Sequence, residues 1–335
     1  MSVNRWRETT YLITGNTLEA VKRSVYLAQQ GKTVLLAVEE TFLAADIGSF
    51  LNCESRTEWR AFFPDSLWEN GYLHPDGYKK YLEQLCREQG AAFLYGLYFV
   101  DAVPAKKEGI EVRFASKGGL YGVRCQYHEV YGLAKDSGKT AYAAWITDET
   151  TGENRILKAP FLWNPAKTEA ENLLAGRREL LQAFGRSKAE NPALNLGRFA
   201  LRAGDGFLAS TKLTRTHFDV IIAGGGTAGA MAALYAARGG AETVLIEPQY
   251  DLGGTSTLGG VSTYWFGNRY RDVEEIDRET DRIERKLGIR RGLGLWSEHD
   301  DFHAGVRGYV LLKLCLDAGV VVVFGQIAYD VVKEG

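Results

Sequence analysis

Three glycines, Gly224, Gly226 and Gly229, have a spacing suited to holding a pyrophosphate. They follow the apolar run 218–223, which is expected to form a strand buried on both faces, and they precede an alanine-rich stretch. The first glycine permits a tight turn, the second lets a phosphate approach the backbone, and the third lets a helix pack closely on the strand. The N-terminus of that helix favours negative charge. The residues predicted to contact the phosphates are Gly224, Gly225, Gly226, Thr227, Ala228 and Gly229.

A carboxylate stands at the end of the next apolar run. Glu247 closes the segment TVLIE and follows Gly224 by 23 residues, near the ~20 residues expected for an acid that binds the ribose of a dinucleotide. Such a carboxylate can accept hydrogen bonds from both ribose hydroxyls, and it would repel a 2′-phosphate, which disfavours NADP. The order strand, glycines, helix, strand and acid favours a dinucleotide site over a glycine turn that is only structural.

A second glycine pair, Gly253 and Gly254, follows Glu247 closely, and Thr255 and Ser256 could donate hydroxyl hydrogen bonds beside it. The stretches GGGTAG, VLIE and LGGTST resemble FAD-dependent oxidoreductases of the glutathione-reductase-like superfamily, near the fumarate reductase flavoproteins. The resemblance implies that the second loop passes the pyrophosphate toward the flavin ring, and that FAD rather than NAD is the cofactor. A loop whose glycines serve only its turns is the alternative.

The rest of the C-terminal part fits the same fold. Apolar residues at helical spacing predict helices over 274–288 and 304–319, and 320–332 reads as a strand. The resemblance implies that this strand lies beside the adenine, whose edge would be read by the backbone near Ile327 and Ala328.

The N-terminal part repeats the pattern of the glycine segment. At an offset of 209 positions, Tyr11 aligns with Val220, and Gly15, Thr17 and Ala20 fall on the three glycines. Self-similarity of this kind predicts two copies of one βαβ-based unit.

The first copy keeps the pattern without the phosphate chemistry. Ala37 stands near the position of Glu247, and Ala44 and Ala45 replace the second glycine pair. Because Cβ atoms there would crowd a pyrophosphate, we interpret the first copy as a degenerate nucleotide fold. The alternatives are chance similarity, or a different small ligand whose site is lined by Glu39, Glu40 or Asp46.

The predicted fold class is α/β, with a Rossmann-like FAD/NAD(P)-binding fold in two tandem βαβ-based units and additional β-hairpins. We expect a degenerate repeat over 9–165, a helical and loop connector over 166–216, and an FAD-binding unit over 217–335. The family pattern continues into a further hairpin and strand, so we expect these residues to be the N-terminal portion of a longer flavoenzyme. Alone, they are expected to bind FAD weakly and to self-associate.

The segment between the copies carries no chemical motif. Two β-hairpins are predicted within 110–163, one of them around a Lys-Gly-Gly turn. A helix is predicted over 168–187, with Arg177 and Arg178 on a solvated face, and 187–216 is expected to be rich in loops.

Composition excludes several classes of function. The 335 residues contain Lys+Arg 40 against Asp+Glu 42 and have a formal charge of -2, so no basic excess points to nucleic acid or to an anionic membrane. The four cysteines form no CxxC pair, which favours buried or free thiols over a metal site. No apolar run approaches the length of a membrane span. We expect a cytoplasmic protein that acts on a small molecule, with a homo-oligomer as one option for its assembly.

The predicted function is an FAD-dependent oxidoreductase, or the FAD-binding portion of one, with an unidentified small organic substrate. The alternatives are an NAD-dependent oxidoreductase and a non-catalytic nucleotide-binding scaffold. No catalytic residue is assigned, because packing or surface roles are favoured for every candidate near the glycine loops. Those candidates are Tyr264, Trp265, Arg269, Arg271, His299 and His303.

Overall fold

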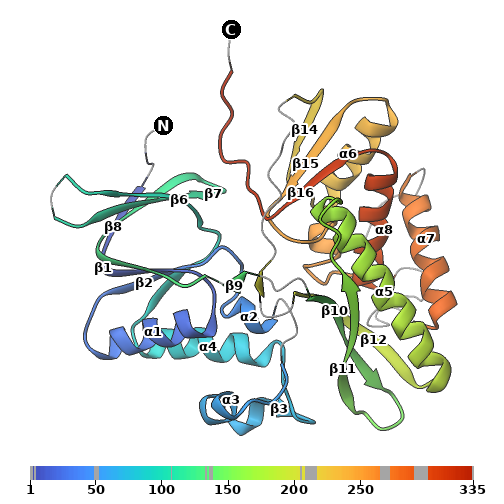
Figure 1. Ribbon diagram of the computed structural model, residues 1–335, viewed down its shortest axis with the longest axis horizontal. Helices are drawn as coiled ribbons and strands as arrows, with labels where there is room; N and C mark the ends of the chain where they lie inside the picture. Colours follow the sequence, from blue (N-terminus) through green and yellow to red (C-terminus); the bar gives the residue numbers. More distant parts are fainter. Residues whose placement is uncertain are drawn as a thin grey trace. The chain divides into compact units, whose positions relative to one another are not determined.

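The computed structural model forms two compact units (Figure 1). The first unit comprises Met1–Ser137, Asp205–Phe207 and Tyr329–Gly335, and the second comprises Gly138–Gly204 and Leu208–Ala328. The structure describes residues 3, 5–48, 53–106, 108–132, 134–135, 139–203, 206–207, 217–264, 272–289 and 301–333.

The first unit is built on a six-stranded sheet with the order β5-β2-β1-β8-β7-β6. The strands β5, β2, β1 and β8 are parallel neighbours, whereas β6, β7 and β8 form an antiparallel meander. The strands are β1 (Arg5–Thr14), β2 (Val34–Ala37), β5 (Ala92–Leu94), β6 (Tyr98–Pro104), β7 (Ile110–Ser116) and β8 (Gly119–Val130). The other elements are α1 (Leu18–Gln29), α2 (Ala45–Gly48), α3 (Thr57–Phe62), α4 (Gly77–Glu88), η1 (Asp65–Leu67), and the short strands β3 (Trp68–Glu69), β4 (Tyr72–Leu73), β9 (Ala134–Lys135) and β13 (Gly206–Phe207).

Local sequence explains how the first unit begins. Thr17 caps α1, because its hydroxyl accepts a hydrogen bond from the backbone N–H of Ala20 at 3.1 Å. The strand β2 is buried throughout, as expected for a strand in the middle of a parallel sheet. Leu12 of β1 and Leu35 of β2 pack with Phe114 of the meander in one apolar cluster.

The second unit contains two sheets and four helices in its described residues. A parallel sheet has the order β14-β15-β16, and an antiparallel sheet has the order β11-β10-β12. The strands are β10 (Lys139–Asp148), β11 (Asn154–Leu162), β12 (Leu194–Ala203), β14 (Val220–Ala223), β15 (Thr243–Glu247) and β16 (Val321–Phe324). The helices are α5 (Glu169–Glu190), α6 (Thr227–Arg238), α7 (Asp272–Leu287) and α8 (Ala304–Asp317), and the short 3-10 turn η2 (Gly254–Ser256) follows β15.

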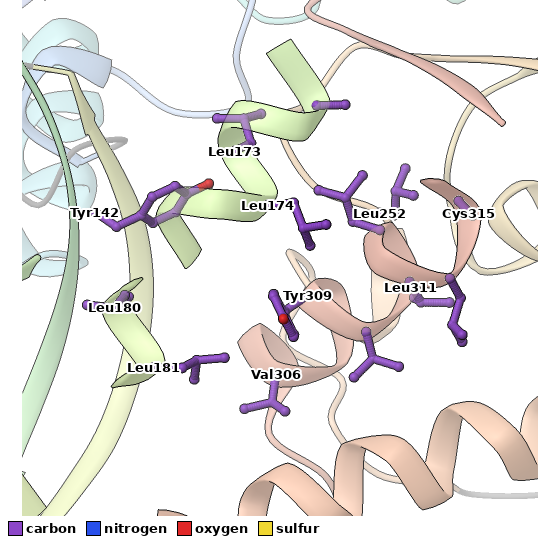
Figure 2. Close-up of a cluster of buried hydrophobic side chains, with 14 of the residues drawn as sticks. Tyr142, Leu173, Leu174, Leu180, Leu181, Leu252, Val306, Tyr309, Leu311 and Cys315 are labelled. Carbon is purple, nitrogen blue, oxygen red and sulfur yellow. The ribbon is translucent and has the colours of Figure 1, made fainter. Parts of the chain in front are cut away.

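Leucines of α5 line the core of the second unit (Figure 2). Leu173, Leu174, Leu180 and Leu181 recur at helical spacing, and they belong to the same buried cluster as residues of α8 and Leu252. The segment that precedes the glycine motif in the chain therefore shares one core with the glycine segment itself.

Most predicted elements are confirmed. The hairpins are β7–β8 and β10–β11, and the predicted helices are α5, α7 and α8. The α/β fold with parallel strands in both units is confirmed as well. Within the described residues no helix is long and apolar enough to cross a bilayer. There, too, all four cysteines are buried outside any disulfide, and no group of metal-ligating side chains is found.

Three strand predictions need correction. The strand β14 is not buried on both faces, since it lies at the edge of its sheet and Ile221 is 64% exposed. The predicted loop 187–216 contains β12, whose partner β10 lies about 50 positions earlier and leaves no local signal. The predicted strand 320–332 stops at Phe324, because Gly325 turns the chain with a φ of +67°.

The placement of the hairpin β10–β11 also differs from the sequence interpretation. It falls in the second unit, whereas the predicted bounds 9–165 put it with the first. The bounds 9–165, 166–216 and 217–335 therefore remain a prediction, as does the origin of the two units as tandem copies.

Candidate functional site

The first glycine loop turns the chain from β14 into α6. Gly224 has a φ of +99°, which favours glycine, and its N–H donates to Ile246 O at 2.8 Å. A Cβ on Gly229 would overlap the carbonyl oxygen of Gly224, so the helix and the turn approach each other as closely as the motif predicts. These two glycines therefore serve the backbone of the loop.

Gly226 is different, because a Cβ there would meet nothing within 4 Å. Its φ of −61° is ordinary, and it stands at the N-cap of α6, where no side chain caps the helix. Thr227 and Ala228 are exposed in the first turn of the helix. The loop thus presents open space and an uncapped helix N-terminus, two properties that suit an anion.

Glu247 holds the first glycine loop from the end of β15. Its carboxylate oxygens accept hydrogen bonds from Gly225 N at 2.6 Å and Gln249 N at 2.7 Å, and the residue is buried. The predicted acid therefore lies directly beside the glycine loop.

The second glycine loop packs on the first. Gly253 N donates to Gly225 O at 2.8 Å, and the Thr227 hydroxyl donates to Gly253 O at 2.8 Å. A Cβ on Gly254 would lie 3.0 Å from the Cα of Gly226, so only glycine fits without a shift. The two glycine loops are therefore joined by hydrogen bonds and pack directly on each other.

The two predicted hydroxyl donors have different environments. Thr255 is exposed in η2. The Ser256 hydroxyl is already bonded to the Gly253 carbonyl at 3.0 Å, so it supports the loop.

Arg177 contradicts its predicted position on a solvated helix face. It is 4% exposed and forms an ion pair with Asp251 at 2.7 Å, whereas Arg178 is exposed. A signal for this burial was present in the sequence: Leu173, Arg177 and Leu180 share the spacing i, i+4 and i+7 on one helix face. Arg177 and Asp251 are the functional candidates that motif reasoning missed.

The matching position of the first unit is filled by side chains. The Asp46 carboxylate accepts from Leu18 N at 3.0 Å at the start of α1, where α6 has open space. Asn16 Nδ2 donates to Glu40 Oε2 at 2.7 Å, and burial raises the pKa of Glu40. Burial also raises the pKa of Asp46 to about 6. Glu39 is exposed.

The register of the first unit refines one predicted correspondence. Thr14 pairs with Ala37 and Ala223 pairs with Ile246, so Ala37 corresponds to Ile246 and Val38 to the acid. Val38 is fully buried, and no carboxylate takes the place of Glu247.

The remaining candidates are structural or lie outside the described residues. His303 caps α8 through Nδ1 and donates from Nε2 to Gly197 O at 2.9 Å, and burial lowers its pKa. Tyr264 donates to Asp277 Oδ1 at 2.8 Å, and burial raises its pKa to about 12. Ile327 and Ala328 lie beyond the end of β16. Trp265, Arg269, Arg271 and His299 lie outside the described residues.

Comparison with protein families agrees with this geometry. Residues 219–335 match the family described as FAD dependent oxidoreductase. The predicted resemblance and its cofactor, FAD, are thereby confirmed at the level of the family. The matched segment begins at β14 and includes both glycine loops and Glu247.

One curated relative is the mitochondrial 5-taurinomethyluridine-tRNA synthase subunit MTO1 of Pongo abelii. It is 35% identical over 98 residues, which are 26% of this chain and 14% of the relative. This chain therefore matches a small part of that relative's length.

Solved structures with partly similar arrangements include a reductase-like protein and a monooxygenase. A geranylgeranyl bacteriochlorophyll reductase-like protein from Thermoplasma acidophilum shares 11% identity over 58% of this chain and 66% of its own, with a TM-score of 0.43. A p-nitrophenol 4-monooxygenase from Pseudomonas putida shares 11% identity over 59% of this chain and 68% of its own, with a TM-score of 0.39.

Proposed function

We propose that the second unit binds FAD and serves a flavin-dependent oxidoreductase that acts on a small organic substrate. The observation that carries the proposal is the open position at Gly226, beside the uncapped N-terminus of α6. A pyrophosphate placed there would receive the favourable field of the helix without displacing any side chain. The match of 219–335 to an FAD-dependent family selects FAD over NAD.

Each predicted residue has a role in this proposal. Gly224, Gly225, Gly226, Thr227, Ala228 and Gly229 form the turn and the helix start that face the pyrophosphate. Glu247 would accept hydrogen bonds from the ribose hydroxyls. The loop Gly253, Gly254, Thr255 and Ser256 would flank the pyrophosphate, and the backbone at Ile327 and Ala328 would lie toward the adenine.

When bound, FAD supplies the redox chemistry by accepting and donating electrons. The described residues of the chain bind and orient the nucleotide part of the cofactor.

We infer that the first unit does not bind a dinucleotide. Asp46 places a carboxylate on the helix N-terminus that would otherwise attract phosphate, and a second anion there would be repelled. Ala44 and Ala45 are fully buried where the second unit has its glycine pair. Both features support a unit that keeps its packing without the ligand.

Titration of the chain with FAD tests the proposal directly, with flavin fluorescence as the readout and NAD as the control ligand. We expect saturable binding of FAD, and protection of the chain against thermal unfolding by FAD but not by NAD. Protection by NAD alone would support an NAD-dependent enzyme. Absence of binding by either ligand would contradict a dinucleotide site in this chain.

A further inference from the structure

We infer that the buried pair Arg177–Asp251 is a positioning device that holds the second glycine loop in the conformation that accepts the cofactor. The inference rests on the proposed function of the second unit. It assigns a role to α5 and β10, which lie outside the segment that matches the FAD-dependent family.

One guanidinium connects three groups. Arg177 Nη1 donates to Asp251 Oδ1 at 2.7 Å, Nη2 donates to Tyr250 O at 3.0 Å, and Nε donates to the Tyr142 hydroxyl at 3.1 Å. Two of the acceptors therefore belong to consecutive residues immediately before the second glycine loop. A planar guanidinium suits such a set of acceptors, because its donors have a fixed geometry.

The walls around the pair leave little freedom. A Cβ on Gly308 of α8 would lie 2.5 Å from the Asp251 carboxylate oxygens. A Cβ on Gly176 of α5 would lie 2.5 Å from the Tyr142 ring. The helix α8 thus packs closely on the Asp251 carboxylate, and α5 packs closely on the Tyr142 ring whose hydroxyl accepts from Arg177.

The contacts continue from Asp251 to the first glycine loop. Asp251 Oδ1 also accepts from Leu252 N at 2.8 Å, and the Leu252 side chain is fully buried. A Cβ on Gly225 would lie 2.6 Å from Leu252 Cδ2, and Gly225 O accepts from Gly253 N. A shift of Asp251 would therefore change the positions of both glycine loops.

The electrostatics favour a specific geometry over a gain in stability. Burial raises the pKa of Asp251, and the Arg177 guanidinium opposes that shift. Burial also disfavours the charge on Arg177, but Asp251 and Tyr142 outweigh it and hold its pKa above the usual value. Buried ion pairs of this kind are often replaceable by apolar residues without loss of stability. What the pair adds is a fixed position for the loop.

The test uses the full 335-residue chain with Arg177→Met, and Arg178→Met as the matched control on the exposed neighbour. The measurements are the Kd for FAD, the unfolding midpoint in urea, and amide hydrogen exchange of 252–260 in the FAD-free chain. We expect Arg177→Met to raise the Kd by about tenfold or more, a size typical of losing a residue that supports a binding group. We also expect Arg177→Met to speed exchange relative to the wild type, and to do so more in 252–260 than in the rest of the unit. Arg178→Met is expected to behave as the wild type.

Two further variants separate positioning from folding. Arg177→Lys retains the charge without the fork and is expected to recover only part of the affinity. Arg177→Met combined with Asp251→Asn removes both charges, so it is expected to recover stability but not FAD affinity, and it replaces the single variant if that fails to fold. A wild-type Kd together with wild-type exchange in 252–260 would overturn the inference. So would faster exchange spread evenly over the unit. If the wild-type chain bound no FAD, the proposed function would fail, and the exchange data would still decide the role of Arg177.

Discussion

In the first unit β1 pairs Tyr11 with Val34, and in the second unit β14 pairs Val220 with Thr243, so the parallel strands are offset by 23 positions in both. After the third parallel strand the chain turns at a glycine in both units. This glycine is Gly96 after β5 and Gly325 after β16, with φ values of +69° and +67°. The two units therefore share the offset of this strand pair and a glycine turn of the same hand, as the predicted repeat requires. The difference lies in what occupies the helix N-terminus.

At that N-terminus the first unit has Thr17 as a cap and Asp46 as a second acceptor. The second unit has Gly226, with open space and no side-chain cap. An internal carboxylate therefore occupies the helix N-terminus of the first unit, and the matching position of the second unit is open where we propose that the phosphate binds. The comparison also gives matched positions at which each unit can be changed.

The largest effect is expected at Gly226. The variant Gly226→Val should keep the fold, because φ is −61° and an added Cβ meets no protein atom, but it should fill the pyrophosphate position. We expect overpacking to cost about 3 kcal/mol or more, which is roughly a 100-fold increase in the Kd for FAD. Fluorescence titration measures this change, and circular dichroism checks the fold. A wild-type Kd would show that the phosphate does not lie at Gly226.

At Gly229 a substitution is expected to lower the stability of the second unit as well as its binding of FAD. Its Cβ would overlap the Gly224 carbonyl, so Gly229→Ala should destabilise the second unit by about 1–3 kcal/mol or more. The first unit has Ala20 at the matched position, where Ala20→Gly should cost about 1 kcal/mol through helix propensity. Urea unfolding compares the two variants. If Gly229→Ala left the chain as stable as the wild type, the loop would be looser than described.

A pH effect is expected from Asp46. Its folded pKa of about 6 lies above the ordinary 3.8, so the folded state favours the protonated carboxyl. The stabilising contribution is complete below pH 3.8 and is lost as pH rises through 6. The side chain of the Asp46→Asn variant does not titrate. Above pH 7 the free energy of unfolding of this variant should therefore exceed that of the wild type by about 1–2 kcal/mol, a figure reduced for the partial exposure of Asp46. Urea unfolding at pH 4 and pH 7.5 tests this, and an equal difference at both pH values would contradict it.

The smallest effect is expected from Thr17→Val. Loss of the N-cap hydrogen bond to Ala20 should destabilise α1 by about 1 kcal/mol. The Kd for FAD should not change, since this position lies in the unit without an open helix N-terminus. Thermal unfolding and FAD titration on one preparation give both values. Loss of FAD affinity comparable to that of Gly226→Val would show that the first unit takes part in binding.

Features with a local cause could be predicted from the sequence. The glycine loop, Glu247 and the helices α5, α7 and α8 depend on neighbouring residues, and their patterns were sufficient. The strand β12 depends on distant β10, so its own residues carried no strand signal strong enough to separate it from a loop. The early end of β16 depends on a single turn at Gly325.

Arg177 shows a different limit. Two adjacent charged residues usually lie on a solvent-exposed helix face. In α5 the apolar face includes Arg177, whereas Arg178 is exposed. Its partner Asp251 lies 74 positions later, where no local rule connects the two. The apolar neighbours of Arg177 on the helix face indicated its burial, but the partner that stabilises the charge could not be found from the sequence.

Amide hydrogen exchange of the chain with and without FAD tests the central claim, that the second unit alone holds the cofactor. We predict that FAD slows exchange at 224–229 and 253–256, where the two glycine loops meet, and leaves 15–20 and 44–46 of the first unit unchanged. Slower exchange at 15–20 and 44–46, or none at 224–229 in a chain saturated with FAD, would contradict the account.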